Sequence, residues 1–162
     1  MGGLDPQDAV LRELRPNEAE ELQSFYDGLS EVAHCFFRPL GLSPSPADYA
    51  NVCSDAASGR RHDLVLEAGG RIVGWAFLQA MDTSTPTLGI GIADPFTGRG
   101  HGKRLMIALI QRARELDKEA IDLCHVVGNE RAHRLYHGLG FIVTGHFRGQ
   151  DGLDYVRMRL TL

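Results

Sequence analysis

The chain has 162 residues, of which 43% are hydrophobic, 7% aromatic and 23% charged; this composition excludes a disordered or fibrous chain and is typical of one globular domain over residues 1–162. The 17 Lys and Arg against 21 Asp and Glu give a net charge of −4, which argues against general electrostatic binding to nucleic acid or an anionic membrane. The 19 glycines exceed the average share of about 7%, so their positions require an explanation.

The cysteines and the N-terminus indicate a compartment. Cys35, Cys53 and Cys124 form an odd set without CxxC spacing, which favours neither a disulfide framework nor a cysteine zinc site. We therefore expect a cytoplasmic protein that needs no metal. Met1–Pro6 lacks the basic and then apolar order of a targeting signal, and no apolar window approaches the ~20 residues of a membrane span.

The first part of the chain predicts a strand and two helices. A mixed apolar run at Ala9–Pro16, ended by proline, indicates the strand. Apolar residues recur at helical spacing over Glu18–Leu29, with Asn17 as the predicted cap. A second helix is predicted over Pro46–Ala57. The segment between the helices, Ser30–Leu40, is rich in aromatic and titratable groups and has no readable pattern.

Strand patterns dominate the rest of the chain. The pair Gly69-Gly70 is typical of a tight turn between two antiparallel strands. The predicted elements are strands at Asp63–Ala68, Arg71–Ala80, Leu88–Ala93, Ile121–Val127, Phe141–Val143 and Tyr155–Leu162, and helices at Lys103–Leu116 and from Asn129 to Gly138. No repeat, low-complexity tract or linker interrupts this order.

Glycines alternate along the predicted strand Leu88–Ala93. Gly89 and Gly91 leave one face of this strand without side chains, which predicts a bulge or a ligand close to bare backbone. The strand leads through the loop Thr97–Gly102 into a helix. Such a loop presents free backbone N–H groups at the positive end of the helix dipole, which suits an anion and above all a phosphate. The alternative is a purely structural turn.

The spacing of the glycines in this loop differs from that of two known phosphate-binding loops. Gly98, Gly100 and Gly102 follow GxGxG rather than the GxGxxG of dinucleotide folds. A Walker loop also fits badly, since Thr97 stands where its first glycine belongs and Arg104 where its Ser or Thr belongs. The basic residues at the loop are Arg99, Lys103 and Arg104. Their charge favours a multiply phosphorylated ligand.

A second distinctive segment spans Asn129–Phe141. A structural interpretation explains most of it, because Asn129 can cap a helix and Gly138 can end it. That interpretation leaves Tyr136 unexplained.

Together the two segments resemble the GNAT superfamily of acyl-CoA-dependent N-acyltransferases. The pyrophosphate loop of that family, Gln/Arg-x-x-Gly-x-Gly/Ala, falls on Thr97–Gly102. Its second pattern, Asn-x-x-Ala-x-x-Leu-Tyr-x-x-Leu-Gly-Phe, is met at Asn129, Ala132, Leu135, Tyr136, Leu139, Gly140 and Phe141. The resemblance is specific over Leu88–Phe141. Thr97 departs from the usual Gln or Arg, although a cradle of backbone amides does not depend on that side chain.

The resemblance implies an α+β fold in which helices flank a mixed, mostly antiparallel sheet. The sheet splays between the strands Leu88–Ala93 and Ile121–Val127, and acetyl-CoA lies in the gap, with its pyrophosphate on the amides from Arg99 to Arg104. The cofactor-binding residues implied in this way are Ile92, Asp94, Arg99, Gly100, His101, Gly102, Lys103, Arg104 and Asn129. The bare backbone at Gly89 and Gly91 would let the acyl group and the amine approach closely.

The resemblance also implies direct attack by a primary amine on the thioester, with Tyr136 as the general acid. A phenol with a pKa near 10 is a suitable donor to a thiolate leaving group. His125 is our candidate for the base that deprotonates the amine; the alternative is a packed, hydrogen-bonded core histidine. Weaker candidates for the base are Glu67, Asp94, Glu31 and His34, and we expect His101, His133 and His137 to be solvated at helix surfaces.

Two other classes of function remain open at this level. The first is a CoA-binding sensor or regulatory domain without turnover. The second is a phosphate-binding NTPase or kinase, which the Walker mismatch opposes. The acceptor amine, small molecule or peptide, is not identified; we expect the segments Ser30–Ala57 and Arg148–Asp154 to shape its site. The resemblance favours a homodimer that pairs through sheet edges or C-terminal strands.

Overall fold

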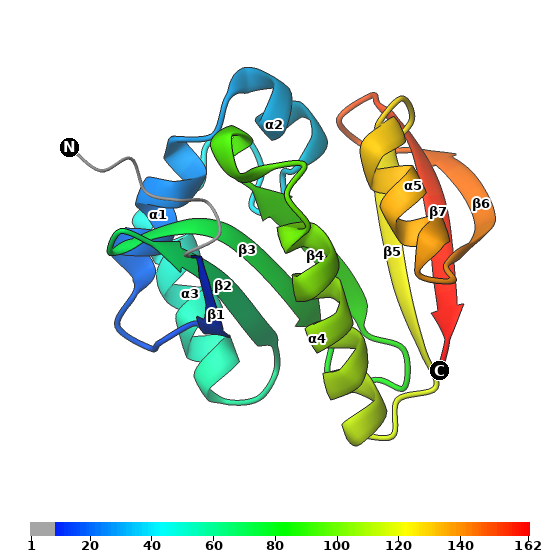
Figure 1. Cartoon of the computed structure of the whole chain (residues 1–162), viewed down its shortest axis with the longest axis horizontal. Coiled ribbons are helices and arrows are strands. Elements are labelled where there is room, and N and C mark those ends of the chain that lie inside the picture. Colours follow the sequence, from blue (N-terminus) through cyan, green and yellow to red (C-terminus); the bar gives the residue numbers. More distant parts are fainter. Residues whose placement is uncertain (1–8) are drawn as a thin grey trace.

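The computed structural model describes residues 9–162, so Met1–Pro6 lies outside the described residues. Seven strands form one open sheet in the order β1-β2-β3-β4-β5-β7-β6 (Figure 1). The strands are β1 Val10–Glu13, β2 His62–Ala68, β3 Arg71–Gln79, β4 Thr87–Ile92, β5 Ala120–Val126, β6 Ile142–Arg148 and β7 Asp154–Thr161. Neighbouring strands are antiparallel except for β4 and β5, which are parallel. This sheet confirms the predicted mixed, mostly antiparallel α+β fold.

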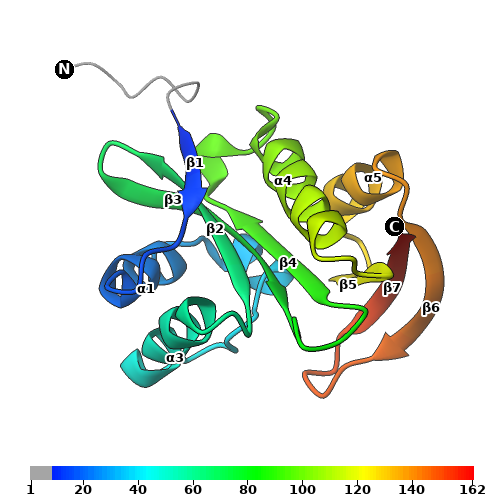
Figure 2. The same cartoon turned by 90° about the horizontal axis from the view of Figure 1, so that it is seen from below.

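Helices cover both faces of the sheet. They are α1 Ala19–Asp27, α2 Glu31–Phe36, α3 Pro46–Ala57, α4 His101–Glu115 and α5 Glu130–Gly138, with a 3-10 turn, η2, at Asp94–Phe96. Figure 2 shows α1 and α3 under one face and α4 and α5 over the other. No helix among residues 9–162 is both long and apolar enough to cross a membrane.

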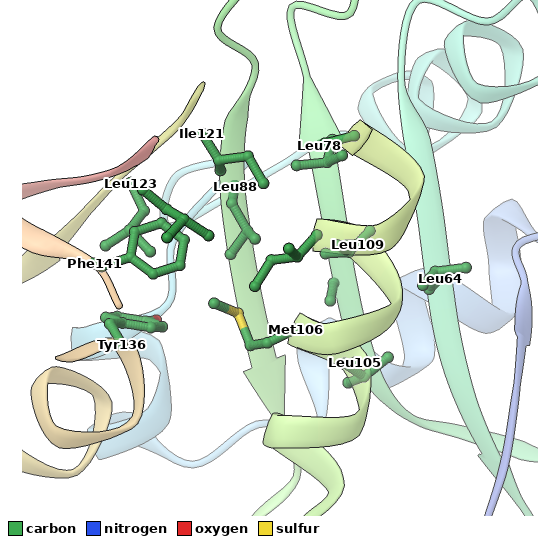
Figure 3. Close-up of a cluster of buried hydrophobic side chains, with 14 of the residues drawn as sticks. Leu64, Leu78, Leu88, Leu105, Met106, Leu109, Ile121, Leu123, Tyr136 and Phe141 are labelled. Carbon is green, nitrogen blue, oxygen red and sulfur yellow. The ribbon is translucent and has the colours of Figure 1, made fainter. Parts of the chain in front are cut away.

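Two hydrophobic cores hold the layers together. On the α4 face, Leu105, Met106 and Leu109 are fully buried against the sheet. Figure 3 shows Met106 extending toward Leu88 and Tyr136, whereas Leu109 and Leu105 lie on the side of Leu78 and Leu64. The apolar stripe of α4 therefore packs against both halves of the sheet. The second core, around Trp75 and Tyr26, lies under α1 and α3 on the opposite face.

Local sequence explains most element boundaries. The helix α3 has the predicted bounds because Ser45 and Asp48 form a capping box and proline occupies its first turn. The helix α1 differs from the prediction, since its cap is Glu18 rather than Asn17. The Glu18 carboxylate accepts a hydrogen bond from the Arg15 amide at 2.8 Å and forms an ion pair with Arg12 at 2.6 Å. Because Arg12 belongs to β1, this ion pair fixes where α1 begins.

The segment without a readable pattern contains the short helix α2. Its N-cap Ser30 accepts a hydrogen bond from the Ala33 amide at 3.1 Å. None of its residues is buried, so it lacks the apolar stripe that reveals longer helices in a sequence.

The strands β4 and β5 diverge after one point of contact. Their register contains a single pair, Thr87 with Asp122. Beyond it, β4 continues toward η2 while β5 pairs with β7 along its whole length. The sheet therefore splays where the sequence predicted it, and backbone groups of both strands face the opening.

We predicted that the face of β4 without side chains is open. In the structure, two aromatic rings pack against it. A Cβ atom added at Gly89 would lie 2.3 Å from Cζ of Phe77, and one at Gly91 would lie 2.3 Å from Cδ1 of Phe37. Two aromatic rings thus rest directly on the glycine backbone. The glycines are required by these rings, and both the rings and the glycine residues line the space beyond.

Candidate active site

A cleft of about 1050 Å³ opens where β4 and β5 diverge. One wall comes from β4, the glycine loop and the start of α4, and the other from β5 and α5. The helix α2 and the β6–β7 turn border the same cleft. Figure 1 shows α2 on one side of the gap between β4 and β5 and the β6–β7 turn on the other.

The glycine loop begins with the turn η2. Thr97 Oγ1 donates to the Asp94 carbonyl at 2.8 Å and closes this turn, so the residue that departs from the family pattern stabilises the loop itself. Gly98 and Gly100 have φ values of 71° and 86°, which L side chains rarely adopt. Within the described part of the chain, the amides of Gly98, Arg99, Gly100, Gly102 and Lys103 donate to no acceptor. These unpaired amides lie together at the N-terminus of α4, an arrangement that favours an anion; we call it the cradle.

The predicted cofactor residues fall into two groups. Those that line the cleft are Ile92, Asp94, Gly100, Gly102, Lys103 and Asn129. Arg99 is exposed, and its Nε donates to the Pro95 carbonyl at 3.2 Å. His101 is buried rather than solvated, and its Nδ1 lies 3.0 Å from Nη1 of Arg104. The amide of Arg104 donates to the Gly100 carbonyl at 3.2 Å, so the free amides end at Lys103.

Asn129 and Tyr136 reach the cleft from α5. Asn129 caps this helix by accepting from the Ala132 amide at 3.4 Å. Tyr136 is buried, and burial raises the pKa of its phenol above the ordinary value of 10.0. Among the described residues its hydroxyl has no hydrogen-bond partner. Its proton is therefore retained at neutral pH and is available to a group in the cleft.

His125 also lines the cleft, but both of its ring nitrogens are engaged. Nδ1 lies 3.0 Å from the Val126 carbonyl and Nε2 lies 2.9 Å from Nδ1 of His133. Because a carbonyl can only accept, Nδ1 carries the proton of the neutral ring and Nε2 accepts from His133. Burial is the largest cause that lowers the His125 pKa below 6.5. His133 is thus half-buried against His125, not a solvated surface residue.

Of the weaker candidates for the base, Asp94 lines the cleft and the other three do not. The Glu67 carboxylate pairs with Arg12 at 2.6 Å on the far strands of the sheet and does not line the cleft. Glu31 and His34 line a separate hollow of about 410 Å³ beside the cleft. Residues 9–162 contain no cluster of three or more His, Cys, Asp or Glu suited to a metal ion.

The sequence interpretation missed several cleft residues. Cys124 of β5 faces the cleft, and burial raises its thiol pKa above 9.0, so the thiol is protonated at neutral pH and a poor nucleophile. The aromatic side chains missed are Phe77 of β3 and Phe147 and Tyr155 of the last two strands. The period-two alternation of these strands was the available signal, but it does not tell which face meets the cleft.

Comparisons with known proteins agree with this geometry. The sequence profile of the Acetyltransferase (GNAT) family matches residues 25–141. The chain belongs to this family. A search of curated proteins found no match.

Solved GNAT structures share the whole fold. An acetyltransferase of the GNAT family from Streptococcus pneumoniae has a TM-score of 0.80 and 23% identity, covering 96% of this chain and 100% of that chain. An acetyltransferase from Salmonella typhimurium, solved with its cofactor acetyl-CoA, has a TM-score of 0.78 and 19% identity, covering 95% and 94%. A variant of spermidine N-acetyltransferase from Vibrio cholerae has a TM-score of 0.74 and 18% identity, covering 94% of both. Because all three sequence identities are low, these matches show only that this GNAT protein shares the fold of those structures.

Proposed function

We propose that this GNAT protein transfers an acetyl group from acetyl-CoA to a primary amine. The observation that carries the proposal is the shared cleft, into which a cradle of free amides opens from one wall and the free Tyr136 hydroxyl from the other. Acetyl-CoA with its pyrophosphate on these amides would have its thioester in the same cleft as the Tyr136 proton donor. The related structure that contains acetyl-CoA supports this choice of donor.

The residues of the cradle fit the acetyl-CoA pyrophosphate. Among the described residues, the amides of Gly98, Arg99, Gly100, Gly102 and Lys103 have no acceptor of their own, and an anion would satisfy them. Lys103 lines the cleft at the first turn of α4 and adds positive charge. Backbone groups near Ile92 and Asp94 lie on the diverging part of β4, where the pantetheine arm would pair. Bound acetyl-CoA supplies the activated acetyl group as a thioester.

Tyr136 is the general acid of the proposed reaction. The amine nitrogen forms a bond to the thioester carbonyl carbon, the carbon–sulfur bond breaks, and the sulfur takes the phenolic proton. The acylated nitrogen then loses its extra proton, which restores the Tyr136 phenol. The raised pKa of Tyr136 keeps the proton on the phenol at neutral pH, so the proton is present when the thiolate forms. Cys124, as a neutral thiol beside it, is no competing nucleophile, which supports direct attack.

His125 is the base that we propose for the acceptor ammonium. Its ring centroid lies 6.0 Å from that of Tyr136, and its lowered pKa keeps it neutral at pH 7. The only lone pair of the neutral ring is at Nε2, which accepts from His133. His125 therefore has to exchange this hydrogen bond for one to the amine.

A CoA-release assay with a panel of primary amines tests the proposal. We expect amine-dependent release of free CoA, with one acetylated amine formed per CoA. A protein that binds acetyl-CoA but releases no CoA with any amine would instead be the sensor, and the catalytic proposal would fail.

A further inference from the structure

The end of the cleft opposite the glycine loop is lined by aromatic side chains from separate elements. Phe37 and Phe77 rest on the glycine backbone of β4. Phe36 of α2 also lines the cleft and remains 38% exposed. Phe147 and Tyr155 stack from the last two strands, with ring centroids 5.2 Å apart. We call these five residues the aromatic wall. An apolar surface of this kind favours an apolar ligand.

The carboxylate beside the aromatic wall, that of Asp151, is already paired. Arg38 Nη2 lies 3.0 Å from the Asp151 carboxylate, across 113 residues of sequence. The same carboxylate accepts from the Tyr155 hydroxyl and, at 3.0 Å, from the Leu153 amide. The Asp151 pKa is lowered by these hydrogen bonds, the Tyr155 bond first. Asp151 is thus a charged carboxylate that already accepts three hydrogen bonds.

The other carboxylates are not placed to help at this end. Among the described residues that line the cleft, the only further acid is Asp94, which begins η2 beside the glycine loop. Glu31 lines the second hollow. Arg38 and Asp151 border both spaces, so their ion pair stands between the cleft and Glu31.

We propose that the acceptor is a monoamine with an aromatic or branched apolar skeleton. This inference rests on the proposed function and names its substrate class. The aromatic wall would bury the skeleton, while the amine faces the thioester. A polyamine would bring a second ammonium beside Arg38 and close to Arg157, whose guanidinium lies 4.8 Å from the Phe147 ring, with no unpaired carboxylate among the described residues at this end, and like charges repel.

Steady-state CoA release with matched amines tests the inference on the full chain. For the unmodified protein, we expect kcat/KM for 2-phenylethylamine to exceed that for ethylamine and that for spermidine by at least ~10-fold each, the order of discrimination that an apolar pocket provides. A preference for spermidine or for a peptide with a free N-terminal alanine would overturn the inference and leave the proposed acetyl transfer intact. Release of CoA with none of the amines would instead mean that the proposed function itself fails.

Phe36→Ala tests the aromatic wall. Since Phe36 is partly exposed on a short helix, its truncation should leave the fold intact. We expect the ratio of kcat/KM for 2-phenylethylamine to that for ethylamine to fall by about 10-fold. The matched control is Ile142→Ala, which truncates a 63% exposed apolar side chain outside the cleft and should leave the ratio unchanged. An equal effect of both variants would contradict the role of the wall.

Arg38→Gln tests the ion pair. The change leaves Asp151 without its cation, and a second ammonium can then take that place. We expect kcat/KM for 1,4-diaminobutane, relative to that for butylamine, to rise by at least ~10-fold. If the Arg38→Gln variant unfolds at the same temperature as the unmodified protein and this kcat/KM ratio is unchanged, Arg38 does not exclude diamines.

Discussion

Tyr136 shows how burial prepares a single residue for chemistry. Its phenol lies in the core beside Phe141, yet its hydroxyl makes no hydrogen bond among the described residues. Its hydroxyl oxygen, unlike that of Tyr49, is not sealed from solvent without a partner, so it stays open to the cleft and can donate to a ligand there.

Tyr136→Phe should lower kcat by about 10²-fold or more, because the thiolate then leaves without a proton donor. The measurement is CoA release across the pH range, with thermal unfolding to show that the variant folds. Tyr49→Phe, which also removes a hydroxyl from a fully buried tyrosine, is the control and should keep kcat. Unchanged turnover of Tyr136→Phe at every pH would remove the acid from the proposal.

His125 carries the expected pH dependence. Its folded pKa is lowered below the ordinary 6.5, first by burial and then by the neighbouring His133, while the Val126 carbonyl and Glu130 act in the opposite direction. Activity that needs a neutral His125 is therefore complete above pH 6.5 and is lost as the pH falls through the lowered pKa.

His133→Ala should move this acid limb toward higher pH. The change removes a neighbour that lowers the His125 pKa and admits water to the buried ring, and both effects return the His125 pKa toward 6.5. The pH profile of kcat/KM measures the shift. His137→Ala, which changes an exposed ring stacked on His133 but not in contact with His125, is the control. An acid limb that stays in place would show that His125 does not titrate in the reaction.

At the scale of elements, β4 is built around its glycines. The rings of Phe37 and Phe77 occupy the positions that side chains at Gly91 and Gly89 would take. This arrangement joins β4 to the residues that follow α2, so the strand and the aromatic wall depend on each other.

Gly91→Ala should destabilise the protein by roughly 1–3 kcal/mol, since its Cβ would overlap the Phe37 ring. Urea unfolding measures the change, and the displaced ring should also weaken acceptor binding. Gly145→Ala in β6 is the matched control, because a Cβ there meets nothing within 4 Å. We expect that variant to be as stable as the parent. Equal stability of Gly91→Ala would mean that Phe37 moves aside at no cost.

At the scale of the whole molecule, the two halves of the sheet are joined mainly by side chains. β4 and β5 pair only at Thr87 and Asp122, while the core under α4 spans both halves. A ligand in the cleft would contact both walls and add to this connection.

Acetyl-CoA at 100 times its Kd should therefore stabilise the fold by about 2.7 kcal/mol. For a domain of this size the shift in Tm is roughly 5–10 °C. Thermal unfolding with acetyl-CoA and with ATP compares the two ligands directly. A larger shift with ATP would contradict the assignment of the glycine loop and favour the NTPase alternative.

The sequence alone determined the order of elements, the glycine loop and the place of Tyr136 on its helix. These features depend on residues close together in the chain: caps, glycines with positive φ, and apolar residues at regular spacing. The helix α2 escaped prediction because it is short and buries no residue.

Only the tertiary structure decided what surrounds those features. The rings on the β4 glycines, the bond between His125 and His133, and the Arg38–Asp151 pair join residues from different elements. Such contacts leave no periodic signal in a sequence, because each side chain is placed by the packing of its own element. The sequence therefore located the glycine loop that we propose holds the acyl donor, while the packing of distant elements formed the wall that we propose selects the amine.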